Sequence, residues 1–115
     1  SPVTRLVFPV GVAYGTDIHR VREILLDIAM NQPEVLKDPA PAAVFEQFAD
    51  SSLNFTLRCF LGSTEQRLEM THRINSLIYT RFAEAGIQIP FPQRVVHLRE
   101  NAKGRENAEE PEKNS

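Results

Sequence analysis

The chain has 115 residues, 42% of them hydrophobic, which fits one domain that buries a core without a metal or a disulfide. The single cysteine, Cys59, excludes an intramolecular disulfide and is consistent with a reducing compartment. The formal net charge is −2, and residues 100–115 hold five acidic and three basic side chains, which leaves ten of each in residues 1–99. This neutral balance argues against nucleic acid as a partner.

A membrane segment is not expected within these residues. The apolar runs fall well short of the roughly 18 to 20 residues that span a bilayer. The first residues also lack the charged start, apolar middle and cleavage site of a signal peptide. We therefore expect the chain to be soluble as it stands.

The first expected strand covers residues 5–14, in two parts. Pro9 cannot donate to a strand ladder, so it should mark a sheet edge or a bend in this strand. The apolar side chains share one parity, which is typical of a strand with one buried face; they are Leu6, Phe8, Val10, Val12 and Tyr14.

A helix is expected after the turn at Gly15, capped by Thr16 or Asp17. It should end near Asn31 and Gln32, because Pro33 follows. Its apolar positions recur at three-four spacing, which predicts one buried face; they are Ile18, Val21, Ile24, Leu25 and Ile28. The proline-rich segment after this helix, up to residue 44, is expected to be an ordered loop.

Two strands of a hairpin are expected within residues 44–62, with Asp50 and Ser51 at the turn. The second strand shows the clearest alternation in the chain, which predicts a sheet with one face in the core and the other largely open. One face carries Leu53, Phe55, Leu57, Cys59 and Leu61, and the other carries Asn54, Thr56, Arg58 and Phe60.

A second helix should follow Gly62, with Ser63 or Thr64 as its cap and Gly86 as its left-handed C-terminal residue. Its apolar positions are Met70, Ile74, Leu77, Ile78, Phe82 and Ala85. A fourth strand is expected to begin at Ile87 and Ile89, to be interrupted by prolines and to resume as a short extra strand over residues 94–99. Residues 100–115 are polar and are expected to be disordered.

The order strand, helix, strand, strand, helix, strand predicts an α+β fold. The simplest packing is a ferredoxin-like two-layer sandwich (βαββαβ), in which two helices cover one face of a mainly antiparallel four-stranded sheet, with the short extra strand at the C-terminus.

Catalytic and metal-binding groups are not expected. His19, His72 and His97 have no Cys or His at metal-ligand spacing, and Cys59 lies on the apolar side of its strand, so no metal or cofactor is predicted. The turn serines lack a nucleophile motif. An RNA-binding sheet face is also disfavoured, because Phe60 is its one aromatic side chain; the same side chain suits a protein interface.

Four segments, in order, carry a resemblance to a known family: GVAYGTD, VLKDPAP, DSSLNFTLR and AGIQIPFPQRVVHLR. Together they closely resemble the C-terminal cytoplasmic domain of the small-conductance mechanosensitive channel family, over about residues 6–99. One departure is Ala49, which stands where many members have glycine before the Asp-Ser-Ser turn.

The resemblance implies a structural role and no enzymatic activity. Members are homo-oligomers, typically heptamers, whose soluble regions enclose a vestibule on the cytoplasmic side of the inner membrane. They open under membrane tension and release ions and osmolytes on hypoosmotic shock. The membrane helices and most of a middle β-domain are not in this sequence, so the chain is expected to be part of a longer protein. As an isolated fragment it is expected to be soluble and could be monomeric.

The resemblance also implies a division of the chain. Residues 1–10 would be the end of the preceding β-domain and the start of the first strand, and residues 11–93 the α+β domain. Residues 94–99 would form a strand that pairs between subunits in a β-barrel, before the tail over 100–115. The predicted assembly residues are Pro90, Phe91, Pro92, Gln93, Val95, Val96, His97, Leu98 and Phe60.

Alternation places Val96 and Leu98 on one side of the terminal strand and Val95, His97 and Arg99 on the other. Pro90 and Pro92 each fix φ and remove a donor, so they should end the fourth strand and redirect the chain, with Phe91 as a candidate anchor.

Two alternatives come from other classes. One is a free-standing ferredoxin-like regulatory module that binds a small molecule at a subunit interface. The other is a small hydrolase of the acylphosphatase type, for which the sequence offers no anion-cradling loop.

Overall fold

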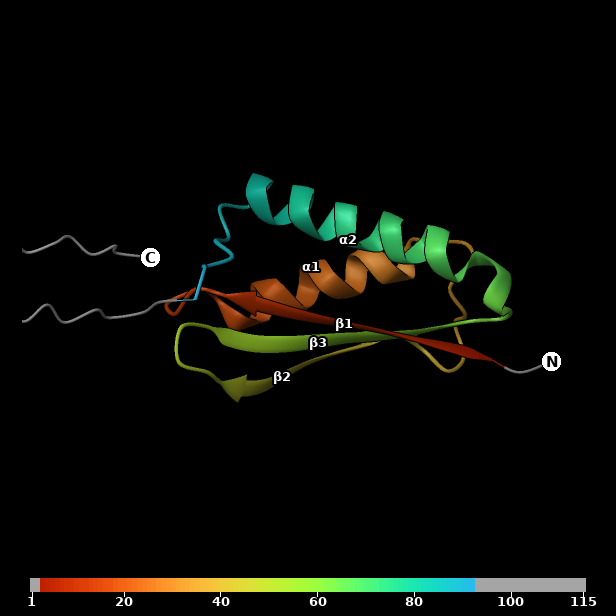
Figure 1. Ribbon diagram of the computed structural model, residues 1–115, viewed down its shortest axis with the longest axis horizontal. Coiled ribbons are helices and arrows are strands. Elements are labelled where there is room, and N and C mark those ends of the chain that lie inside the picture. The colour runs from red at the N-terminus through yellow and green to blue at the C-terminus, as the bar shows by residue number, and fades with distance from the viewer. Residues whose placement is uncertain (1–2, 93–115) are drawn as a thin grey trace, which may run out of the picture.

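The computed structural model describes residues 3–92, which form a two-layer α+β domain (Figure 1). In chain order the elements are β1 (Thr4–Val12), α1 (Ile18–Met30), β2 (Ala42–Phe48), β3 (Leu53–Leu61), a short 3-10 turn η1 (Thr64–Gln66) and α2 (Arg67–Glu84). Figure 1 shows both helices on the same face of the sheet. The predicted fold class is therefore confirmed.

The sheet is antiparallel, and its strand order is β1-β3-β2. β3 lies between its hairpin partner β2 and the distant strand β1, as the ferredoxin-like topology requires. β1 and β3 pair without a break from Thr4 opposite Leu61 to Val12 opposite Leu53. Pro9 therefore causes no bend. It lies in a strand at the edge of the described sheet, where a missing donor is tolerated.

The fourth strand that the sequence predicted at Ile87 and Ile89 is not formed in residues 87–92. A single turn after α2 reverses the chain, and Gln88 then accepts a hydrogen bond from the backbone N–H of Ala13 at 2.9 Å, beyond the end of β1. Pro90 and Pro92 follow at once, and neither can donate to a ladder. The described sheet therefore has three strands.

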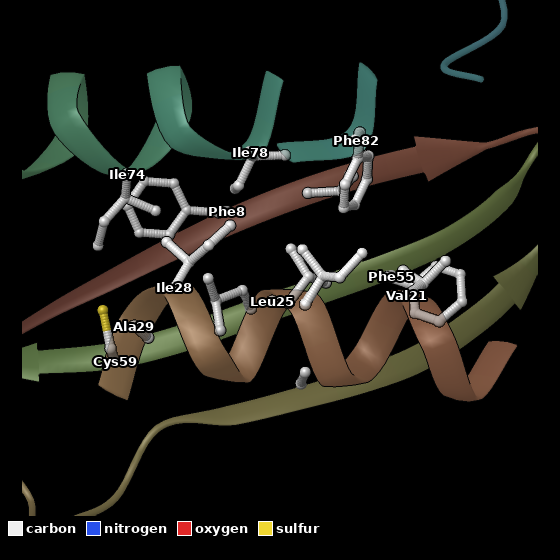
Figure 2. Close-up of a cluster of buried hydrophobic side chains, with 14 of the residues drawn as sticks. Phe8, Val21, Leu25, Ile28, Ala29, Phe55, Cys59, Ile74, Ile78 and Phe82 are labelled. Carbon is white, nitrogen blue, oxygen red and sulfur yellow. The ribbon is translucent and has the colours of Figure 1, made fainter. Parts of the chain in front are cut away.

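Both helices bury the stripes that the three-four spacing predicted (Figure 2). Phe82 of α2 and Leu25 of α1 are almost fully buried, in the same core cluster as Phe55 and Cys59 of β3. Burying each such side chain contributes roughly 1.5–3 kcal/mol. The full set that Figure 2 labels is Phe8, Val21, Leu25, Ile28, Ala29, Phe55, Cys59, Ile74, Ile78 and Phe82.

The helix ends follow local rules. Asp17, not Thr16, caps α1, because its carboxylate accepts from the backbone N–H groups of His19 and Arg20 at 3.0 and 3.3 Å. Ser63 caps η1, the first turn before α2. Gly86 has φ +73° and closes α2, as predicted.

The face of the sheet away from the helices is less open than its alternation predicted. Thr56 is buried and donates a hydrogen bond to the Glu46 carboxylate at 2.5 Å. Phe60 is half-buried, so the prediction that it is exposed is wrong. The backbone oxygen of Phe60 accepts from Leu36 N–H at 2.8 Å, because the loop after α1 runs beside the end of β3.

A β-bulge interrupts β2 between Phe45 and Gln47. Phe45 and Phe48 are three residues apart and would face opposite sides of a regular strand. The bulge adds Glu46, so Phe45 lies opposite Phe55 and Phe48 lies opposite Leu53, both of which are core residues. Both rings therefore face the helix side, where they meet edge to face with centroids 5.0 Å apart.

Candidate functional site

The predicted assembly residues Pro90, Phe91 and Pro92 lie at one end of the domain, which we call the exit end. It comprises Ala13 and Tyr14 after β1, the turn of residues 49–52 between β2 and β3, and residues 88–92 after α2. In Figure 1 the segment after α2 descends to this end, beside the β2–β3 turn.

The end of α2 fixes how the chain enters the exit end. Gly86 N–H donates to Ala83 O at 3.2 Å and Ile87 N–H donates to Phe82 O at 2.9 Å, the pattern of a Schellman motif. Ile87 is buried against the core. Together with the bond from Ala13 to Gln88, these contacts hold the chain in place immediately before Pro90.

Tyr14 joins the β1 side of the exit end to the β2–β3 turn. Its hydroxyl donates to the backbone oxygen of Ala49 at 2.5 Å. Ala49 N–H in turn donates to Ser52 O at 2.8 Å. Ala49 has a negative φ, so alanine fits this turn without strain although many relatives were expected to have glycine. Pro90, Pro92 and residues 49–52 line an open depression of about 350 Å³.

The predicted site residues are only partly brought together. Phe91 is 78% exposed, so it is not an anchor in the core of the described domain. Phe60 pairs with Arg5 near the start of β1, whereas the exit end adjoins the end of β1. Gln93, Val95, Val96, His97 and Leu98 lie outside the described residues.

The described residues contain no group of three or more His, Cys, Asp or Glu side chains placed to hold a metal. His19 and His72 are exposed on different helices. Burial raises the pKa of the Cys59 thiol to about 11, which keeps it protonated and inert at neutral pH. Ser52 donates to the side chain of Asn54 at 2.7 Å and supports the turn.

No helix within residues 3–92 is both long enough and apolar enough to cross a bilayer.

Two arginines of α2 form contacts that the sequence did not reveal. Arg73 donates to the Glu34 carboxylate at 3.0 Å, and Arg81 pairs with Asp27 at 3.0 Å. These two ion pairs connect the C-terminal half of α1 and the turn after it to α2. Asp27 and Arg81 are 54 positions apart in the sequence, so no local spacing rule pairs them.

The fold and the exit end define a small two-layer α+β domain of ferredoxin-like architecture. The model of the family described as "Mechanosensitive ion channel MscS, C-terminal" matches residues 6–89. The chain belongs to this family and corresponds to its C-terminal domain.

Similar proteins agree with this assignment. An uncharacterized MscS family protein of Haemophilus influenzae is 42% identical over 106 residues, and the mechanosensitive channel MscK of Escherichia coli is 39% identical over 106 residues. Each alignment covers 92% of this chain but only 10% and 9% of the respective relative. An MscS family protein of Archaeoglobus fulgidus is 36% identical, with 89% of this chain and 37% of the relative covered.

The crystal structure of Helicobacter pylori MscS in its closed state has the same fold, with a TM-score of 0.76 at 23% identity. The superposition covers 88% of this chain and 40% of that chain. This chain therefore spans well under half of the length of these relatives.

Proposed function

We propose that this domain is the cytoplasmic assembly domain of a tension-gated channel that releases ions and osmolytes on hypoosmotic shock. The observation that carries the proposal is the family match over residues 6–89, which takes in every helix and strand of the described domain except the first two residues of β1. The relatives with assigned roles are described as mechanosensitive channels and not as enzymes.

In this proposal the channel is a homo-oligomer, with seven subunits as in the family, on the cytoplasmic side of the inner membrane. The soluble regions of the subunits enclose a vestibule below the pore. The domain performs no chemistry, and its role is to hold the vestibule walls in place. Membrane helices in a preceding part of the gene product would sense the tension.

The exit end supports the assembly role. The Schellman motif, the Ala13–Gln88 bond and the two prolines fix the direction in which the chain leaves α2. We propose that residues 94–99 then pair with the same residues of neighbouring subunits in a β-barrel. A strand this short needs partners on both edges in order to be stable. A closed barrel provides them, because it leaves no strand edge unpaired.

The experiment uses cells that lack their own mechanosensitive channels and express the gene product that contains this chain. We expect these cells to survive hypoosmotic shock better than cells with an empty vector. Phe82→Ala removes a buried core side chain of this domain and should abolish the protection. Tyr79→Ala removes an exposed side chain of the same helix and should preserve it.

A wild-type protein that reaches the membrane in normal amounts but gives no protection would contradict the proposed function. Equal protection by both variants would contradict the need for a folded assembly domain.

A further inference from the structure

Four large apolar side chains are exposed in the exit end or directly beside it, and we call them the end patch: Tyr14, Phe48, Ile89 and Phe91. Their exposed fractions are 52%, 70%, 44% and 78%. Within residues 3–92 the other aromatic side chain exposed to this degree is Tyr79, on α2. Exposed aromatic side chains are thus concentrated where the described chain leaves the domain.

A hydrogen bond and a shared depression connect the segments that carry the end patch. Tyr14 reaches across the end of the sheet to the oxygen of Ala49, the residue after Phe48. Pro90 and Pro92, on either side of Phe91, line the same depression as the turn that begins at Ala49. The three segments that carry the end patch therefore meet at the same end of the domain.

The bulge in β2 contributes directly to this surface. Without the extra residue Glu46, Phe48 would face the opposite side of the sheet from Phe45. With it, Phe48 follows the partly buried Phe45, which stacks on the buried Phe55 with centroids 5.1 Å apart, so the aromatic cluster continues to the surface. Exposed apolar side chains gathered at one end of a domain are typical of a surface that takes part in an interaction.

The remaining chain offers a covering segment at very short range. Residues 93–115 follow Pro92, and their large apolar side chains, Val95, Val96 and Leu98, all come within the first six positions. An extended chain covers about 3.3–3.6 Å per residue, so Val96 reaches roughly 14 Å and Leu98 roughly 20 Å from Pro92. A tether this short makes the entropic cost of closing the loop small.

Only one side of this segment suits an apolar surface. In an extended segment Val96 and Leu98 share one side, while Val95, His97 and Arg99 share the other. Burying the second side would desolvate an imidazole and a guanidinium, which is costly without partners.

We propose that Val96 and Leu98 of the same chain cover the end patch, so that Val95, His97 and Arg99 face away from the domain. The inference goes beyond the proposed function, because it assigns a direction to each side of the segment whether or not the chain forms a channel. In the proposed barrel one side of each strand faces the lumen and the other the exterior, so this arrangement places Val96 and Leu98 on the exterior.

Tyr14 serves as a built-in reporter of this covering. The chain has two tyrosines and no tryptophan. Tyr79 is 74% exposed on α2, so Tyr79→Phe leaves Tyr14 as the one tyrosine fluorophore without disturbing the core. Quenching of Tyr14 emission by acrylamide in this 115-residue background then measures how far the end patch is covered.

Replacing Val96 and Leu98 together by serine should raise the quenching constant about twofold, because it opens the patch locally while the core stays folded. The matched pair Val95→Ser and His97→Ser should leave quenching unchanged. Phe48→Ser, with residues 93–115 unchanged, removes the patch side of the proposed contact and should also raise the quenching constant. Far-UV circular dichroism confirms that each variant is folded.

Unchanged quenching in the Val96 and Leu98 variant, or an equal rise with both serine pairs, would overturn the inference. Quenching that falls as protein concentration rises would also overturn it, because the cover would then come from a second copy. The measurement needs no membrane or oligomer, so its failure is distinct from failure of the osmotic-shock experiment.

Discussion

Phe82 and Phe91 have opposite surroundings in the described domain. Phe82 is 1% exposed and packs from α2 onto the sheet, whereas Phe91 is 78% exposed at the exit end. The helical spacing of Phe82 predicted its burial. The surroundings of Phe91 were harder to predict, because prolines on both sides remove the periodicity from which burial is inferred.

Phe82→Ala should therefore lower the free energy of unfolding by about 3–5 kcal/mol, as a large-to-small change in a packed core. Phe91→Ala should lower it by less than about 1 kcal/mol, because most of its surface is already in water. Urea unfolding followed by circular dichroism measures both changes. Similar losses for the two variants would show that Phe91 is buried in solution.

Glu34 gives the domain a pH dependence. A backbone hydrogen bond at Glu34, opposed by partial burial and helped by the Arg73 guanidinium at 3.0 Å, holds the pKa of this carboxyl below its ordinary value of 4.5. The folded state thus binds the proton more weakly than the unfolded state. The ionised Glu34 carboxylate therefore stabilises the folded state fully at pH values above its ordinary pKa. This stabilisation is lost as the pH falls through the lowered pKa.

Glu34→Gln should accordingly destabilise the domain near neutral pH and have a much smaller effect at about pH 3. Urea unfolding of both proteins over this range gives the difference directly. Glu69→Gln is the control, since its carboxylate is 65% exposed and lies 3.7 Å from Arg73. A Glu34→Gln effect that does not vary with pH would refute the assigned role.

At the scale of elements, the ends of the helices are determined by residues close in sequence. Gly86 has φ +73° and ends α2, whereas Gly62, before η1, has no such requirement. A Cβ at Gly62 would lie 3.8 Å from Leu36, an ordinary contact. The two glycines differ in backbone conformation and not in the space around them.

Gly86→Ala should cost about 1–2 kcal/mol, because an L-residue pays this amount for a left-handed conformation. Gly62→Ala should change the free energy of unfolding by less than about 0.5 kcal/mol. Thermal and urea unfolding of the two variants measure the difference. If Gly62→Ala proved the more harmful of the two, the Schellman geometry at the end of α2 would be wrong.

Features that depend on residues close in sequence could be predicted, whereas contacts between distant residues could not. The cap at Asp17, the end of α1 before Pro33 and the turn at Gly86 all depend on neighbours within a few positions. The pair of Asp27 with Arg81 joins residues 54 positions apart, which no helical spacing rule detects. The bulge at Glu46 also escaped prediction, because it depends on how two whole strands pair.

At the scale of the molecule, the predicted fold class and topology hold, but the described sheet lacks the fourth strand. The alternation of Ile87 and Ile89 favoured a strand, yet Ile87 is buried as part of the turn that closes α2, and Pro90 and Pro92 prevent a regular ladder. The exit end could not be predicted as a surface, since it unites three segments. From the sequence, Pro90 and Pro92 do predict a change of chain direction at this end.

Patch-clamp recording can show whether this domain belongs to a tension-gated channel, as we propose. The gene product that contains this chain is reconstituted in liposomes, and suction is applied to excised patches. We expect stepwise openings whose probability rises with membrane tension. Phe82→Ala should suppress these openings, and Tyr79→Ala should preserve them. Patches that contain the wild-type protein but show no tension-dependent conductance up to the point of rupture would contradict the account.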